Sequence, residues 1–129
     1  MRKMKPNFFF LLFFFCVSSV FAKFVWINFA HNSAATFFYD PGTLKKNKES
    51  RIIRILANYT NPTTSGELSA VVKQEFDCKR ARYRIIKLKS HSKKNGKGKI
   101  ITKFKDRDRW KMVVSGSPDA DLMKIICTN

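Results

Sequence analysis

The stretch EFDCKRARYRIIKL, residues 75–88, lies in the segment that decides the fold. No Gly or Pro occurs from residue 68 to residue 90, and 23 extended residues would form a strand roughly 75 Å long. A single domain cannot hold such a strand, so the chain must reverse within the segment. The only dense polar cluster in its middle is DCKR, residues 77–80, and Asp favours the first position of a tight turn. The sequence therefore predicts a hairpin with strands near residues 69–76 and 81–89.

The charges of this hairpin allow two interpretations. Side chains alternate along a strand, so Arg82 and Arg84 share one face of the second predicted strand, while Tyr83 lies on the other. The two arginines either extend a basic surface or form ion pairs with Glu75 and Asp77 across the hairpin. The sequence leaves both interpretations open.

Further strands are expected on both sides of the hairpin. Strands are predicted at residues 24–29 (FVWINF), 35–40 (ATFFYD) and 51–59 (RIIRILANY). The second of these strands is expected to end at Asp40-Pro41-Gly42. Downstream, Asn95-Gly96 predicts a hairpin turn. A strand over residues 99–105 then has an apolar face and a basic face, formed respectively by Ile100, Thr102 and Phe104 and by Lys99, Lys103 and Lys105.

The C-terminal residues change to a helical period. Ser117 is a good N-cap, Pro118 suits the first helical position, and two acids follow where the helix dipole favours negative charge. An apolar stripe then appears at helical spacing, formed by Leu122, Met123, Ile125 and Ile126. Such a short helix is unstable alone in water, so it is expected to dock on the sheet.

The N-terminus predicts export. A basic head, a thirteen-residue apolar run over residues 8–20 and Ala22 form a secretory signal peptide, residues 1–22, which leaves residues 23–129 as one domain. A retained membrane anchor is the alternative, but a span takes about 20 apolar residues. No transmembrane segment is expected after cleavage. Export leads to the periplasm, the outer-membrane surface or the medium.

Two cysteines, Cys78 and Cys127, remain after cleavage, and an even count in an exported protein predicts a disulfide. A free or metal-bound thiol is the alternative, but two isolated cysteines and two distant histidines provide no pair of metal ligands at short spacing. We therefore expect neither a metal nor a cofactor. The predicted fold is of the α+β class, a single antiparallel sheet of about six strands with one C-terminal helix tethered by a disulfide.

The charge points to anionic partners. Three of the 26 basic residues and none of the nine acids lie in the predicted signal peptide, which leaves a net charge of +14. Such a charge predicts salt-sensitive attraction to polyanions but does not choose among acidic polysaccharide, lipopolysaccharide, membrane and nucleic acid. Phe104 and Trp110 are the only aromatics near the densest basic run, so specific nucleic-acid binding by base stacking is not expected.

Between residues 87 and 111, eleven of 25 residues are Lys or Arg. A solvated sheet edge protected by lysine is one interpretation, and a ligand-binding basic patch is the other. The patch residues would lie partly at a mobile hairpin tip, namely Lys93, Lys94, Lys97 and Lys99, and partly along the strands, namely Lys87, Lys89, Lys103, Lys105 and Arg107, with Arg82 and Arg84 beside them.

Catalysis is not expected. His31 and His91 both fall in predicted loops, and a ribonuclease-type pair would need both imidazoles beside one phosphate. Nothing in their spacing brings them together, so surface histidines are the favoured interpretation. No nucleophile elbow, phosphate loop or zinc-ligand helix occurs in the sequence.

Several segments together resemble the bacterial surface-adhesin protein E family. They are YDPGTL at residues 39–44, IRILANYTNP at 53–62, EFDCKRARYR at 75–84, Trp110 with VVSGS at 113–117, and LMKIIC at 122–127. The resemblance implies a small antiparallel sheet whose C-terminal helix is tethered by the disulfide. It also implies an adhesin for host matrix proteins such as vitronectin and laminin, without catalytic residues. The family tends to carry Trp where this chain has Arg54.

The sequence thus predicts an exported cell-envelope protein, an adhesin-type module whose basic surface binds anionic or host matrix ligands. The alternatives are a periplasmic structural or interaction protein without a host ligand and, third, a secreted basic nuclease. The sequence makes no prediction of oligomeric state.

Overall fold

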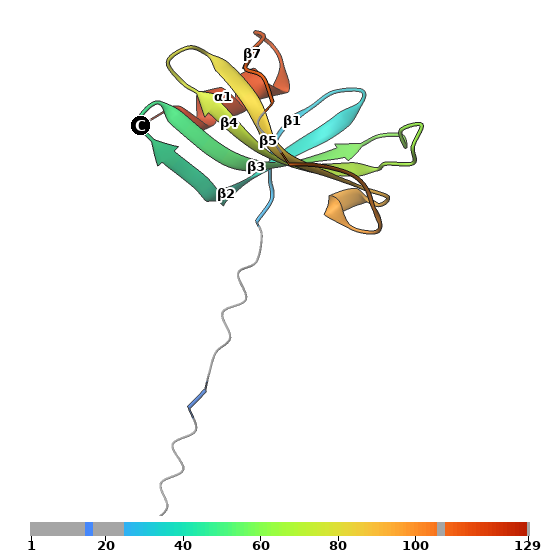
Figure 1. Cartoon of the computed structure of the whole chain (residues 1–129). Coiled ribbons are helices and arrows are strands. Elements are labelled where there is room, and N and C mark those ends of the chain that lie inside the picture. Colours follow the sequence, from blue (N-terminus) through green and yellow to red (C-terminus); the bar gives the residue numbers. More distant parts are fainter. Residues whose placement is uncertain (1–14, 17–24, 106–107, 129) are drawn as a thin grey trace, which may run out of the picture.

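The computed structural model describes residues 15–16, 25–105 and 108–128. They form one antiparallel sheet with a helix on one face, as predicted (Figure 1). Six strands follow one another across the sheet in chain order, and a short seventh pairs with the beginning of the fifth. The elements are β1 (Ile27–His31), β2 (Ala35–Asn47), β3 (Ser50–Tyr59), β4 (Ser69–Asp77), β5 (Arg82–His91), the 3₁₀ turn η1 (Lys94–Gly96), β6 (Ile100–Lys105), β7 (Lys111–Met112) and α1 (Pro118–Ile126).

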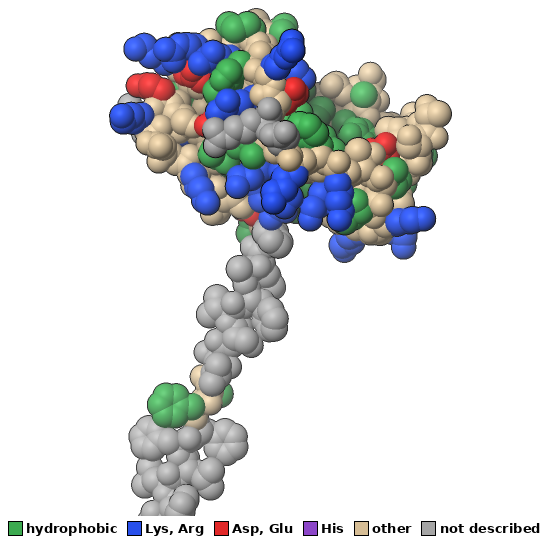
Figure 2. Space-filling view, viewed as in Figure 1, with side chains coloured by type: hydrophobic (Ala, Val, Ile, Leu, Met, Phe, Trp, Pro, Cys, Tyr) green, Lys and Arg blue, Asp and Glu red, His purple; other side chains and the backbone are tan. Residues whose placement is uncertain are grey.

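The two faces of the sheet differ in character. The helix α1 lies on the upper side of the sheet in Figure 1, and its buried Leu122 and Ile126 pack with Ile53, Ile55 and Phe76. In the same view, Lys and Arg side chains line the lower side of the domain (Figure 2). The apolar core therefore lies between the sheet and α1, and the helix-free face is largely basic.

The predicted turn at residues 77–80 is confirmed. Asp77 pairs with Arg82 at the end of the β4–β5 ladder, and the Asp77 Oδ1 atom accepts hydrogen bonds from the amides of Lys79 and Arg80, each at 3.2 Å. Ala81 completes the reversal with a φ of 50°, in the left-handed region that few non-glycine residues adopt. The Asp side chain thus stabilises the turn that splits the glycine-free segment.

The expected end of the second strand at Pro41 is wrong. β2 continues to Asn47 through a bulge between Asp40 and Lys45, so residues 41–44 stand out from the ladder. The Thr43 hydroxyl donates to the Asp40 carbonyl at 2.7 Å and accepts the Arg54 amide at 3.0 Å. These two bonds replace missing ladder bonds, and a bulge tolerates a proline because no ladder donor is required there.

The apolar face expected for residues 99–105 is not buried. Ile100 and Phe104 are each 38% exposed, and the core beneath α1 is formed by side chains of β3 and β4 instead. Ile125 of the predicted helical stripe is also exposed, at 44%. The helix is too short to cover the outer strand, so alternation along β6 does not produce burial.

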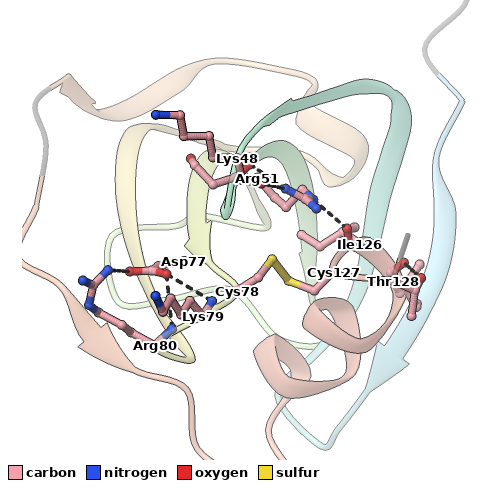
Figure 3. The surroundings of a disulfide bond; sticks show 11 residues. Lys48, Arg51, Asp77, Cys78, Lys79, Arg80, Ile126, Cys127 and Thr128 are labelled. Atoms are coloured by element: carbon pink, nitrogen blue, oxygen red, sulfur yellow. Dashed lines mark hydrogen bonds and ion pairs between the residues drawn. A yellow bond between two sulfur atoms is a disulfide. The ribbon is translucent and has the colours of Figure 1, made fainter.

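The disulfide between Cys78 and Cys127 is confirmed, and it joins the β4–β5 turn to the end of α1 (Figure 3). The Cα atoms of the two cysteines are 5.7 Å apart. Beside it, the buried Arg51 donates from Nε to the Ile126 carbonyl at 3.1 Å and from Nη1 to the carbonyls of Lys48 and Ser50. One guanidinium therefore joins the C-terminus of the helix to the β2–β3 turn.

Replacing Arg51 by methionine is expected to lower the free energy of unfolding by about 1–3 kcal/mol, because buried carbonyls lose their donors and the helix dipole loses a cation. Urea unfolding measures the change. Arg51→Lys keeps the charge without the planar fork of donors and should recover only part of the loss. Full recovery by lysine would contradict the role of the hydrogen bonds.

Candidate functional site

Six cations form one surface on the helix-free face. Ile53 and Ile55 point to the helix, so alternation places Arg54 on the opposite side of β3. Strand register then aligns Arg54 with Lys73 on β4, Lys73 with Lys87 on β5, and Lys87 with Lys105 on β6. A second row aligns Lys89 with Lys103. We call the six residues Arg54, Lys73, Lys87, Lys89, Lys103 and Lys105 the cationic face.

Like charges stand directly opposite one another on this face. Such cross-strand pairs are unfavourable, and the only acid that extends the first row is Asp40, across from Arg54 on β2. The charge of Lys89 lowers the pKa of Lys87, helped by partial desolvation and by the charges of Lys105, Lys73 and Arg54. The charges around Lys87 on the cationic face therefore repel one another.

A groove of about 710 Å³ opens on the same face. Its apolar lining includes Ile52 and Val71, and the β2 bulge contributes Gly42, Thr43 and Leu44. Five cations line it as well, and no acid does: Lys45, Arg54, Lys73, Lys87 and Lys89. The groove therefore combines an apolar floor with a basic rim.

Arg82 and Arg84 lie on the helix-free face but are neutralised. Arg84 Nε lies 2.6 Å from Glu75 Oε1, and Arg82 Nε lies 3.0 Å from Asp77 Oδ2. Both guanidiniums also stack on the Trp110 ring, at 4.2 and 4.4 Å from its centroid. The second interpretation of these arginines, ion pairing across the hairpin, therefore describes the structure.

The pKa of Asp77 reflects this pairing. Burial opposes ionisation of the carboxyl, but hydrogen bonds from Arg82 and from the amide and guanidinium of Arg80 outweigh it and lower the pKa. A carboxyl with a lowered folded pKa stabilises the fold above its ordinary pKa, and the stabilisation is lost as the pH falls through the lowered value. The ion pairs thus support the hairpin at neutral pH.

The hairpin tip is anchored rather than free. Asn58 and Asn95 exchange two hydrogen bonds of 2.8 Å, and Ser69 Oγ donates to the Lys93 carbonyl and accepts the Gly96 amide. These bonds connect the tip to β3 and β4. Its lysines are all exposed at one end of the cationic face: Lys93, Lys94, Lys97 and Lys99.

Sequence reasoning and structure differ in the membership of the basic surface. The register sets two pairs of the proposed patch lysines opposite each other, Lys87 with Lys105 and Lys89 with Lys103. It adds Arg54 and Lys73, which lie far from the lysine-rich run. Arg107 lies outside the described residues. Only the strand register could have revealed the two additional cations.

The two histidines lie far apart. His31 ends β1 and is exposed, whereas His91 ends β5 and is only 9% exposed, so the expectation of surface histidines is wrong for His91. The register His31–Thr36–Asn58–Ser69–His91 separates them by four strand spacings, roughly 19 Å. One phosphate cannot lie beside both imidazoles.

Within residues 15–16, 25–105 and 108–128, no helix is long and apolar enough to cross a membrane. Over the same part of the chain, His, Cys, Asp and Glu do not gather in groups of three or more that could hold a metal ion.

These features define a small single-sheet domain whose helix is tethered by a disulfide and whose opposite face is cationic. The chain belongs to the Surface-adhesin protein E family, whose family model matches residues 26–128. No curated protein sequence matches.

Solved structures of Haemophilus influenzae protein E are similar to this chain. One has a TM-score of 0.62 at 11% identity and covers 79% of this chain and 83% of that chain. Its selenomethionine form has a TM-score of 0.60 at 13% identity, with 79% and 84% covered. A second crystal form has a TM-score of 0.56 at 11% identity, with 82% and 96% covered. At these identities the likeness shows a shared fold.

Proposed function

We propose that this chain is an exported adhesin-type module whose cationic face binds anionic ligands, either acidic polysaccharide or acidic segments of host matrix proteins such as vitronectin. The observation that carries the proposal is the alignment of Arg54, Lys73, Lys87 and Lys105 across four adjacent strands. Aligned like charges are unfavourable in the free protein, and a bound polyanion relieves their repulsion.

Membership of a surface-adhesin family supports export to the cell envelope. We propose that residues 1–22 are the cleaved signal peptide and that residues 23–129 form the binding domain. The separation of the two histidines argues against the nuclease alternative, so a binding role without catalysis is the function that we propose. The periplasmic alternative differs in location and in having no host ligand, and protease treatment of intact cells tests the location.

The purified domain should bind immobilised heparin and vitronectin at low salt and lose affinity steeply as salt rises. Six cation contacts predict a loss of roughly a thousandfold between 50 and 200 mM NaCl, because each neutralised anion releases a counterion. Titration at several salt concentrations measures this dependence. Absence of binding at 50 mM NaCl would contradict the proposed function.

Exposure on intact cells tests the location separately. Protease added to whole cells should digest the protein if it lies on the surface and should spare it if it lies in the periplasm. A periplasmic marker protein that survives in the same sample provides the control. Protection equal to that of the marker would contradict surface display and favour the periplasmic alternative.

A further inference from the structure

We propose that the groove beside the β2 bulge is a binding site for one short segment of a sugar chain that carries sulfate or phosphate esters. This inference rests on the proposed function and makes it more specific, because it assigns the ligand to a defined binding site on the cationic face. The groove volume of about 710 Å³ falls within the range of small-molecule sites, roughly 300–1,000 Å³. A surface that bound by charge alone would need no such hollow.

The lining of the groove matches the two sides of an esterified sugar. Ile52 and Val71 are both half-buried and provide the apolar floor, which suits the C–H faces of a pyranose ring. Lys73, Lys87 and Lys89 provide ammonium groups at the rim, which suit ester oxygens through charge-assisted hydrogen bonds. A ligand with both surfaces therefore makes more contacts here than an equally charged chain without sugar rings.

The bulge closes one side of the groove, and hydrogen bonds hold it in place. Thr43 Oγ1 bonds to the backbone of Asp40 and Arg54, and the Gly42 amide donates to Asp40 Oδ1 at 3.0 Å. Asp40 is only 5% exposed and is not among the described residues that line the groove. The side of the groove that the bulge forms is therefore preformed in the absence of a ligand.

The lining also disfavours nucleic acid. Single-stranded nucleic acid is bound by stacking bases on aromatic side chains, and no aromatic residue lies among the described residues that line the groove. Trp110 is elsewhere on the face and stacks with Arg82 and Arg84. Backbone charge alone would remain to hold a nucleic acid.

The test compares a short sugar ligand with a sugar-free polyanion. A heparin tetrasaccharide, a bis-phosphorylated glucosamine disaccharide and inorganic polyphosphate are titrated against the domain and against Ile52→Ala plus Val71→Ala. The double variant keeps every cation, so it should bind at least one of the two sugars about tenfold more weakly or worse and polyphosphate unchanged. The sugar that loses more affinity shows whether the groove prefers sulfate esters or phosphate esters.

Control variants and long heparin make the outcomes distinct. Lys73→Gln plus Lys87→Gln should weaken the sugars and polyphosphate alike, and thermal melting verifies folding, with Ile52→Ala alone as the milder substitution. Sugar binding that is unaffected by loss of the floor, or weakened only as much as polyphosphate binding, would overturn the proposal. Binding of long heparin but of neither short sugar overturns the groove and leaves the proposed function intact. Failure of long heparin as well overturns both.

Discussion

Replacing both Cys78 and Cys127 by serine is expected to lower the free energy of unfolding by about 4 kcal/mol. The bond closes a loop with a sequence separation of 49, and its loss frees the unfolded chain from that constraint. The free energy of unfolding of such a domain is only about 5–15 kcal/mol, so the disulfide contributes a large share of it. The loss should appear first in α1, whose nine residues cannot hold a helix without docking.

Urea unfolding followed by circular dichroism measures the effect. Ser117→Ala provides the matched control, because Ser117 Oγ caps the same helix by accepting the Ala120 amide at 3.2 Å but has no part in the bond. Loss of this cap should lower the free energy of unfolding by about 1 kcal/mol. A loss for the double serine variant no larger than for Ser117→Ala would contradict the tethering role.

Reversing two charges on the cationic face should strongly weaken heparin binding while raising thermal stability. With Lys87→Glu and Lys103→Glu, the new carboxylate at position 87 stands between Lys73 and Lys105, and that at position 103 stands opposite Lys89. Every lysine pair across β4, β5 and β6 then becomes a pair of opposite charges, which is favourable. The charge of the six-residue face falls from +6 to +2, so heparin affinity should fall at least about a hundredfold.

The opposite directions of the two effects exclude misfolding as the cause of lost binding. The pKa of Lys87 is lowered, which means that its charged form is disfavoured in the folded protein at neutral pH and that the penalty is relieved as the pH rises towards the ordinary value of lysine. Lys46→Glu plus Lys79→Glu changes the net charge equally at exposed positions away from this face. Equal loss of heparin binding in that control would show that net charge alone determines affinity.

The sequence predicted the parts of the fold that depend on chain length and local residue chemistry. The turn at residues 77–80 follows from the impossibility of one long strand, and the cap at Ser117 follows from residue types at a helix start. The predicted strand end at Pro41 was wrong because a proline ends only a regular strand. Here a bulge accommodates the proline, and Thr43 provides the missing hydrogen bonds. A side chain three residues beyond the expected strand end is too distant a signal for pattern reasoning.

The candidate site was less predictable because it depends on register. Counting back from the Asp77–Arg82 pair places Ile86 opposite Lys73, but an irregularity between Lys73 and Gln74 shifts the pairing to Lys87. That one-residue shift brings Lys87 and Lys89 onto the helix-free face, since side chains alternate. No residue type in the sequence announces the shift, so the alignment of the four cations could not be predicted.

Charge composition also could not show which cations pair with acids across the hairpin. In the sequence, Arg82 and Arg84 look as available for binding as the lysines. In the structure, Arg82 forms an ion pair with Asp77 and Arg84 with Glu75, and both guanidiniums stack on Trp110. The alternation of side chains showed that pairing across the hairpin was one option. The distances of 2.6 and 3.0 Å show that it is the one adopted.

The salt dependence of heparin binding tests most directly whether the aligned cations form the binding surface. Six contacts predict a slope of log K against log [NaCl] of roughly −4 to −5 for the natural sequence. Lys87→Gln plus Lys103→Gln should reduce the magnitude of this slope by about 1.4–1.8, because two fewer counterions are released. Lys46→Gln plus Lys79→Gln should leave it unchanged. An equal reduction in both pairs, or none in the first, would contradict the assignment of the cationic face.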